Sequence, residues 1–131
     1  MEQAKLDDFL KEIERVGEKA GPIKLDIIVE PNPLRIPPYK AVTLRAQLEN
    51  LTDSPFPLKL YIAWRHPTGL IARTTERDIV VGAHEVTHVV DKHTPKASGI
   101  RKVMAAVFRN QEIVAAKERT FEVIKELFPR L

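Results

Sequence analysis

Three of the four histidines, His84, His88 and His93, lie within ten residues of one another. A zinc site needs side chains that converge on the ion at about 2.0–2.1 Å. On an extended strand His84 and His88 share a face, but a rise of about 3.3 Å per residue separates them by roughly 13 Å. The spacing therefore predicts turn and surface histidines, with His88 half-buried beside Val86 and Val90, and no metal site.

Nucleophiles and acid–base pairs are also poorly placed for catalysis. Ser54 and Ser98 lie in loops, and neither is part of a Gly-x-Ser-x-Gly turn. Glu76 and Asp78 share one face of a predicted strand, where a solvated edge explains them better than a glycosidase pair. The chain has no cysteine and its five glycines are isolated, which argues against thiolate chemistry and a phosphate-binding loop. We predict a protein that is not an enzyme and has no catalytic residue, metal ion or cofactor.

Basic side chains offer a third kind of chemistry, the binding of phosphate groups. Arg45, Lys59 and Arg65 face outward on predicted strands together with Tyr61, and they form a candidate polyanion-binding face. Acidic residues such as Glu49 interleave with them, and the net charge of +3 is far from a strong nucleic-acid footprint. Nucleic-acid binding is therefore an alternative to protein binding and not the first expectation.

Asn50-Leu51-Thr52 is an N-glycosylation sequence, which matters only in a secretory pathway. The first twenty residues alternate charged and apolar side chains, unlike a signal peptide, and no apolar run approaches the roughly 20 residues of a membrane span. We therefore expect a cytoplasmic protein in which Asn50 closes a strand at a turn. The 30% of charged residues and the ten prolines favour a thermophilic source.

The elements that position these groups begin with a helix over residues 3–20. Apolar side chains recur there at helical spacing, and Gly21 and Pro22 follow as a helix end. A sandwich does not need this helix to close its core. Its apolar stripe is therefore the predicted partner-binding site. We expect the stripe to cover the chain's own sheet, to pair with a second copy or to dock in the groove of another protein. The stripe consists of Leu6, Phe9, Leu10, Ile13 and Val16.

After Pro22 the apolar period changes from helical to two, which is typical of half-buried strands. Seven or eight short strands follow, with turn signals every 8–12 residues, and the prolines lie outside strand interiors. This pattern predicts an antiparallel β-sandwich with Trp64 in its core and a closing hairpin around Asn110-Gln111. We expect an N-terminal helix over 1–21, the sandwich over 22–126 and a C-terminal tail over 127–131.

Two stretches resemble prokaryotic immunoglobulin-like modules of the adhesion, macroglobulin and fibronectin III types, over about residues 23–124. One is LDIIVEPNPLRIPPYKAVTLRAQLENLTDSPFPLKLYIAWRHPTG, with its Pro-containing kink, and the other is SGIRKVMAAVFRNQEIVAAKERTFEVI, with its short turn. The modules usually start the penultimate strand with Gly-x-Tyr, where this chain has Gly99-Ile100-Arg101. The resemblance implies an immunoglobulin-like fold and is nearly silent on function.

Three function classes follow from these observations. The first is a non-catalytic protein-interaction or structural module, such as a subunit of an archaeal or viral assembly, that binds a protein partner or its own copy. The second is nucleic-acid or polyanion binding through the basic face. The third is a carbohydrate- or ligand-binding sandwich, for which only Tyr39, Tyr61 and Phe56 could supply an exposed aromatic platform. We expect no membrane span, and the sequence identifies no small-molecule substrate.

Overall fold

The computed structural model describes residues 21–30, 35–36 and 40–124. The predicted N-terminal helix with its apolar stripe, and the C-terminal tail, lie outside these residues. In the described part no helix has the length and hydropathy that crossing a membrane requires. The strands are β1 (Ile23–Glu30), β2 (Arg35–Ile36), β3 (Val42–Asn50), β4 (Phe56–Arg65), β5 (Ile71–Val81), β6 (Val86–His93), β7 (Gly99–Arg109) and β8 (Glu112–Val123).

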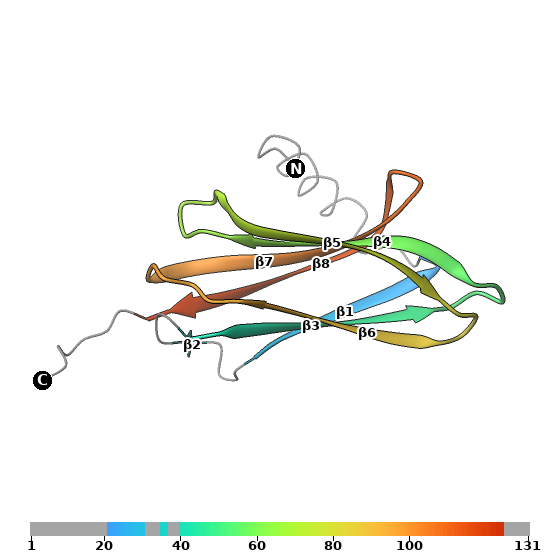
Figure 1. Ribbon diagram of the computed structural model, residues 1–131, viewed down its shortest axis with the longest axis horizontal. Coiled ribbons are helices and arrows are strands. Elements are labelled where there is room, and N and C mark those ends of the chain that lie inside the picture. The colour runs from blue at the N-terminus through green and yellow to red at the C-terminus, as the bar shows by residue number, and fades with distance from the viewer. Residues whose placement is uncertain (1–20, 31–34, 37–39, 125–131) are drawn as a thin grey trace, which may run out of the picture.

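The strands form two sheets that face each other (Figure 1). One sheet has the order β1-β3-β6, and the other has the order β2-β8-β7-β4-β5. Seven strands pair antiparallel, which confirms a mainly β, two-layered sandwich. The short β2 departs from the expected all-antiparallel arrangement, because it pairs parallel with β8. It lies within the proline-rich segment that follows β1.

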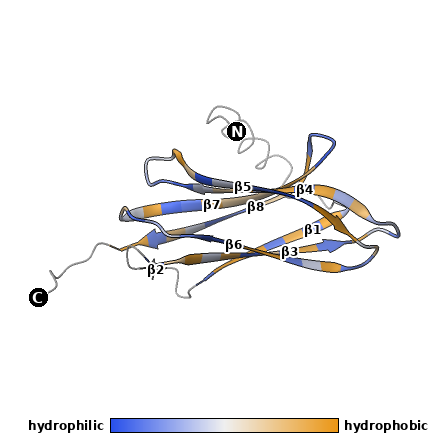
Figure 2. Ribbon diagram, in the orientation of Figure 1, coloured by the Kyte–Doolittle hydropathy of each residue, from blue (hydrophilic) through white to orange (hydrophobic). Residues whose placement is uncertain are grey.

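The core between the sheets receives alternate side chains from its strands, and the alternation of burial is most regular on β1. Buried and exposed residues alternate at every position of β1, and the exposed residues are polar except for Ile28. Trp64, on β4, is fully buried in this core, as predicted. The turn between β7 and β8 is polar (Figure 2), and Asn110 and Gln111 both adopt the left-handed backbone of a tight hairpin.

Two details of the strands differ from the sequence-based expectation. Pro57 is the second residue of β4, although the prolines were expected outside the strands. It lies near the end of the pairing with β5, where a proline is tolerated. The segment from Ile71 to Val81 forms one continuous strand, whereas the sequence pattern indicates a short strand over residues 70–74 and a second over residues 76–81. This strand is the edge of the five-stranded sheet, and its centre, Arg73–Asp78, is entirely polar. Backbone pairing with β4, and not apolar alternation, therefore sets its length.

Candidate functional site

The outer face of the five-stranded sheet, which points away from the sandwich core, carries buried apolar side chains. Tyr61 is 1% exposed, Met104 2% and Ala63 0%, and these three form a cluster separate from the main core. An antiparallel sheet usually keeps one face polar and solvated. The described strands form only two layers (Figure 1), so none of them lies over this outer face.

Strand register extends this cluster across three strands. Tyr61 is paired with Ala106, which is paired in turn with Ala116, and Ala63 is paired with Met104. Residues directly opposite each other on neighbouring strands share a face. Ala106 is 0% exposed and Ala116 7%. These five residues of β4, β7 and β8 are the outer apolar patch.

The sequence contains a signal for this patch that is separate from the alternation of apolar and polar residues. The run Leu60–Trp64 is apolar at every position, and so is Val103–Val107. Strands that are buried on both faces have near-continuous apolar sequences. The expectation that Tyr61 belongs to an exposed basic face was therefore wrong, because its ring lies buried on the outer side of β4 and packs edge-on against Phe108, with ring centroids 6.5 Å apart.

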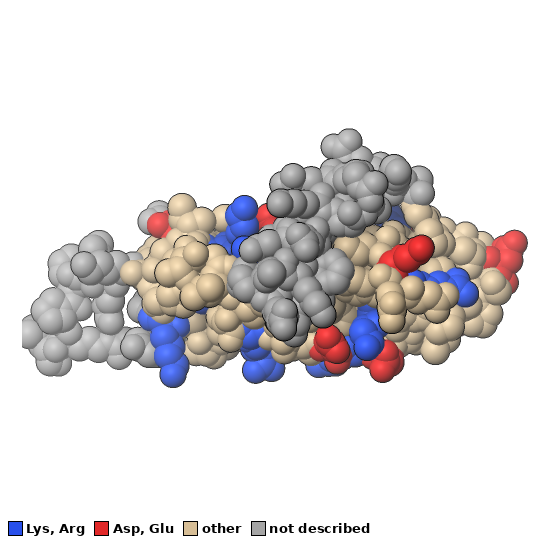
Figure 3. All heavy atoms as spheres, turned by 90° about the horizontal axis from the view of Figure 1, so that it is seen from above, with Lys and Arg blue, Asp and Glu red and all other residues tan. Residues whose placement is uncertain are grey.

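The candidate polyanion-binding residues do not come together. Arg45 is on β3 in the three-stranded sheet, whereas Lys59 and Arg65 are on β4 in the other sheet. Arg45 pairs with Glu30 at 3.7 Å, and Lys59 pairs with Glu76 at 3.9 Å. Acidic and basic side chains are interspersed over the visible part of the molecule in Figure 3. The four predicted residues therefore form no single basic face.

A pocket of about 650 Å³ adjoins the patch and shares Tyr61 with it, and Phe108, which packs against Tyr61, also lines the pocket. Burial, and then the charge of Glu76, raise the pKa of the Tyr61 hydroxyl, so this group stays a neutral phenol at physiological pH. The Thr74 side chain lowers this pKa, which is the smallest of the three effects. The Tyr61 oxygen makes no hydrogen bond of standard geometry with a described residue. The pocket offers apolar contact, and both acidic and basic side chains surround it. Its other lining residues include Pro57, Val80, Lys59, Asp78 and Arg109.

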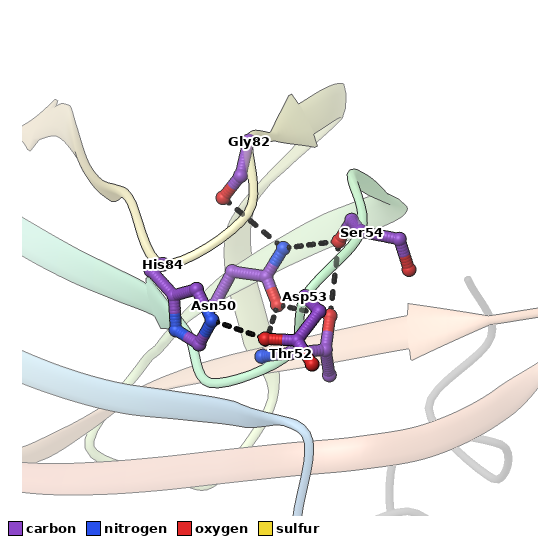
Figure 4. Close-up of polar contacts among 6 residues, drawn as sticks. All are labelled: Asn50, Thr52, Asp53, Ser54, Gly82 and His84. Carbon is purple, nitrogen blue, oxygen red and sulfur yellow. Dashed lines mark hydrogen bonds and ion pairs between the residues drawn. The ribbon is translucent and has the colours of Figure 1, made fainter.

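The Asn50-Leu51-Thr52 segment forms a turn closed by the Asn50 side chain, as predicted (Figure 4). The Asn50 Nδ2 donates to the carbonyl oxygens of Ser54, Val81 and Gly82, and Thr52 donates to Oδ1 through its backbone and its hydroxyl. Asn50 is 0% exposed. Because its amide nitrogen is buried and engaged, this residue cannot accept a glycan in the folded protein.

The histidines of the described chain lie apart from one another. His84 has a left-handed backbone, and its Nε2 lies 2.6 Å from the carboxylate of Asp53 on the surface (Figure 4). His88 is exposed, so its expected half-burial was wrong. The inward face of β6 carries Val89 and Asp91, which leaves His88 on the solvent side. Among residues 21–30, 35–36 and 40–124 no group of three His, Asp or Glu side chains could hold a metal ion.

One buried polar cluster lies between the sheets. The indole nitrogen of Trp64 donates to Asp91 Oδ2 at 2.8 Å, and Thr75 donates to the same carboxylate. The ring of His93 lies against Trp64, with centroids 5.3 Å apart. Arg101 is 3% exposed and donates to two backbone carbonyls. Trp64 and Thr75 belong to the five-stranded sheet and Asp91 to β6 of the other sheet, so these two hydrogen bonds hold the sheets together.

His93 makes the stability of the sandwich depend on pH. Burial lowers its pKa from 6.5, Arg101 and Arg73 add to this effect, and Asp91 opposes it. Below pH 6.5 the unfolded chain binds a proton at His93 before the folded chain does. The stabilisation is therefore complete above about pH 6.5 and is lost as the pH falls through the lowered folded pKa.

Urea unfolding between pH 7.5 and 5 measures this effect. We expect the wild type to lose stability relative to His93→Phe, which keeps an aromatic ring beside Trp64. The matched control is His88→Gln, on the exposed face of the same strand, which keeps His93 and should therefore still lose stability as the pH falls. Parallel curves for the wild type and His93→Phe would refute the prediction.

Carbohydrate binding requires an exposed aromatic platform. Of the three candidates for it, the structure describes Phe56 and Tyr61, and neither supplies one. Phe56 is 3% exposed, and the guanidinium of Arg109 lies 4.3 Å from its ring centroid. Tyr61 is buried, and Tyr39 lies outside the described residues. A sugar would need an accessible ring face for stacking, and neither Phe56 nor Tyr61 offers one.

Solved structures with a similar arrangement include whole domains and parts of enzymes. The CARDB domain of a Pyrococcus furiosus protein, solved with di-metal ions, has 17% identity and a TM-score of 0.56, over 77% of this chain and 86% of that one. The C-terminal domain of Wzt has 14% identity and a TM-score of 0.61, over 82% and 77%. The fold is an immunoglobulin-like β-sandwich.

A third similar structure is the alkylpurine DNA glycosylase of Pseudomonas fluorescens, solved bound to DNA containing an abasic site analog. It has 21% identity and a TM-score of 0.61 over 79% of this chain, which spans only 31% of the glycosylase chain. No family model and no curated protein matches the sequence. At these identities the immunoglobulin-like sandwich is shared, and sandwiches of this kind host unrelated functions.

Proposed function

We propose that this immunoglobulin-like sandwich is a non-catalytic interaction or structural module that holds an amphipathic polypeptide segment on its outer apolar patch. The observation that carries the proposal is the burial of Tyr61 and Met104, at most 2% exposed, on a face over which no described strand lies. Burying one such side chain contributes about 1.5–3 kcal/mol. Apolar side chains on an outer face are rarely left uncovered, and a further polypeptide segment over this face would account for their burial.

The chemistry around the patch fits an amphipathic segment. Charges of both signs flank the apolar centre as the pairs Lys59–Glu76 and Lys102–Glu118. A segment with one apolar face and a mixed-charge polar face would meet both parts. The outer face of the other sheet differs, because Gln47, at its centre, is exposed there among charged neighbours. That face also carries Ile28, Val86 and Val90, but these side chains are exposed, whereas the large apolar side chains of the patch are buried.

Thiol accessibility tests whether the patch is covered in solution. The chain has no cysteine, so a single engineered thiol reports one position. We expect Ala106→Cys, on the patch, to react with a maleimide at least roughly tenfold more slowly than Gln47→Cys on the opposite outer face. Ala105→Cys, which faces the core from the neighbouring position, sets the rate of a fully buried thiol. Equal rates for Ala106→Cys and Gln47→Cys would mean that nothing covers the patch.

A further inference from the structure

We infer that the segment held on the outer apolar patch is the chain's own residues 3–20, packed as an amphipathic helix. This inference rests on the proposed function, which says that the patch holds a polypeptide segment and leaves open whose segment it is. Three observations carry it: where the described chain begins, how far the preceding residues reach, and how their chemistry matches the patch.

The described chain begins beside the five-stranded sheet. A Cβ atom added to Gly21 would lie 2.9 Å from the carbonyl oxygen of Val114, on β8. The next residue, Pro22, accepts a hydrogen bond from the Leu51 backbone nitrogen at 2.9 Å. Val114 is two residues from Ala116 of the patch. Residues 3–20 are therefore tethered at the margin of the patch, although β1, which follows them, belongs to the other sheet.

The length of the preceding segment suffices to cover the patch. A helix over residues 3–20 is about 27 Å long at a rise of about 1.5 Å per residue. Met104 is paired with Glu118, four residues along β8 from Val114, which is a distance of roughly 14 Å. The helix therefore spans the patch along the strands with length to spare.

The chemistry of the two surfaces matches. The helix stripe of Leu6, Phe9, Leu10, Ile13 and Val16 is apolar, and its opposite face carries charges of both signs. The patch combines the large Tyr61 and Met104 with three alanines, and small side chains beside large ones let facing elements interdigitate.

Tethering decides between this segment and an identical segment from a second copy. A short linker gives a segment an effective concentration in the millimolar range at its own site. Gly21 attaches residues 3–20 at the edge of the patch, so a second copy could compete only at a comparable protein concentration. The proposal therefore commits to the chain's own segment.

Cross-linking in the cysteine-free chain of 131 residues identifies the occupant. We expect Val16→Cys, on the stripe, to be joined to Ala106→Cys within one chain by a short bifunctional thiol reagent. Val16 and Ala116, the partner of Ala106, each lie roughly 7 Å from the place where Gly21 meets Val114. The control pair replaces Glu18, two residues from Val16 and on the opposite side of the predicted helix, and should react at least roughly fivefold more slowly. On a denaturing gel an internal cross-link migrates as a monomer and a cross-link between copies as a dimer.

Disrupting the stripe gives an independent result. In the Ala106→Cys background, Phe9→Asp combined with Ile13→Asp should speed maleimide labelling at least roughly tenfold. The core thiol of Ala105→Cys should stay slow in the same double variant, which shows that the sandwich remains folded. If both thiols become fast, the double variant has unfolded, and the internal cross-link alone then decides.

Each remaining outcome contradicts a different statement. Dimeric cross-links in place of internal ones would show that a second copy occupies the patch, which overturns this inference and leaves the proposed function standing. A slow Ala106→Cys with neither cross-link would point to a different occupant, with the same consequence. A fast Ala106→Cys in the otherwise unchanged chain would refute both the inference and the proposed function.

Discussion

Asn50→Ala is expected to lower the free energy of unfolding by about 2–4 kcal/mol. The Asn50 amide is fully buried and donates to three carbonyl oxygens at 2.9–3.1 Å. Alanine leaves these acceptors, which lie on two separate segments, without their donor. Urea unfolding followed by the fluorescence of Trp64, the single tryptophan, measures the loss.

Asn50→Asp separates hydrogen bonding from shape. The aspartate has nearly the same volume, but it places an oxygen where Nδ2 now faces the carbonyls of Ser54, Val81 and Gly82. We expect a loss at neutral pH at least as large as that of Asn50→Ala. Asn110→Asp is the matched control, because Asn110 is exposed and aspartate tolerates its left-handed backbone, so it should change stability by less than about 0.5 kcal/mol. An Asn50→Asp variant as stable as the wild type would contradict the assigned role of this amide.

Asp91→Ala is the second substitution with a large expected effect, about 2–4 kcal/mol of unfolding free energy. Asp91, on β6 of the three-stranded sheet, is 4% exposed. It accepts from Trp64 on β4 and from Thr75 on β5, both in the other sheet. Alanine would leave the buried indole N–H without its acceptor, and would remove the carboxylate that lies 4.0 Å from Arg73. Urea unfolding measures this loss as well.

A double-mutant cycle with Trp64→Phe isolates the bond between the sheets. Phenylalanine keeps an aromatic ring and removes the N–H donor, so Asp91→Ala should cost about 1–2 kcal/mol less in this background. Asp91→Asn is the conservative control, since its side-chain oxygen can still accept from the indole. Strictly additive losses for Trp64→Phe and Asp91→Ala would mean that this hydrogen bond does not stabilise the fold.

Local periodicity was sufficient to predict much of the sandwich. β1 alternates at every position, and a period of two follows directly from strand geometry, so its buried side chains could be assigned from sequence alone. Trp64 followed from the same alternation on β4. The turn at Asn110-Gln111 was also predictable, because it lies between two strands of clear period. These features depend on neighbours along the chain.

The candidate site could not be predicted in the same way, because it depends on tertiary placement. Alternation tells which residues of one strand share a face, but not which sheet the strand joins, so Arg45 and Lys59 were assigned to one surface although they belong to two sheets. β6 carries valine on both faces, so its sequence does not tell which face is buried. The inward face is the one that carries Asp91, whose hydrogen-bond partner Trp64 is distant in sequence. The continuous apolar runs of β4 and β7 were the one available signal for a covered outer face.

The polar centre of β5 has a consequence for the behaviour of the protein at high concentration. Among the described strands β5 is the edge of its sheet and pairs on one side only, and such an edge can template the addition of a strand from another molecule. The six consecutive polar residues Arg73–Asp78 occupy the middle of that edge. A strand that docked there would have to strip water from two arginines and two acidic side chains. This charged edge therefore opposes amyloid-like aggregation. The outer apolar side chains of the same sheet lie on its face, where strands do not add, because backbone hydrogen bonds form only in the plane of the sheet.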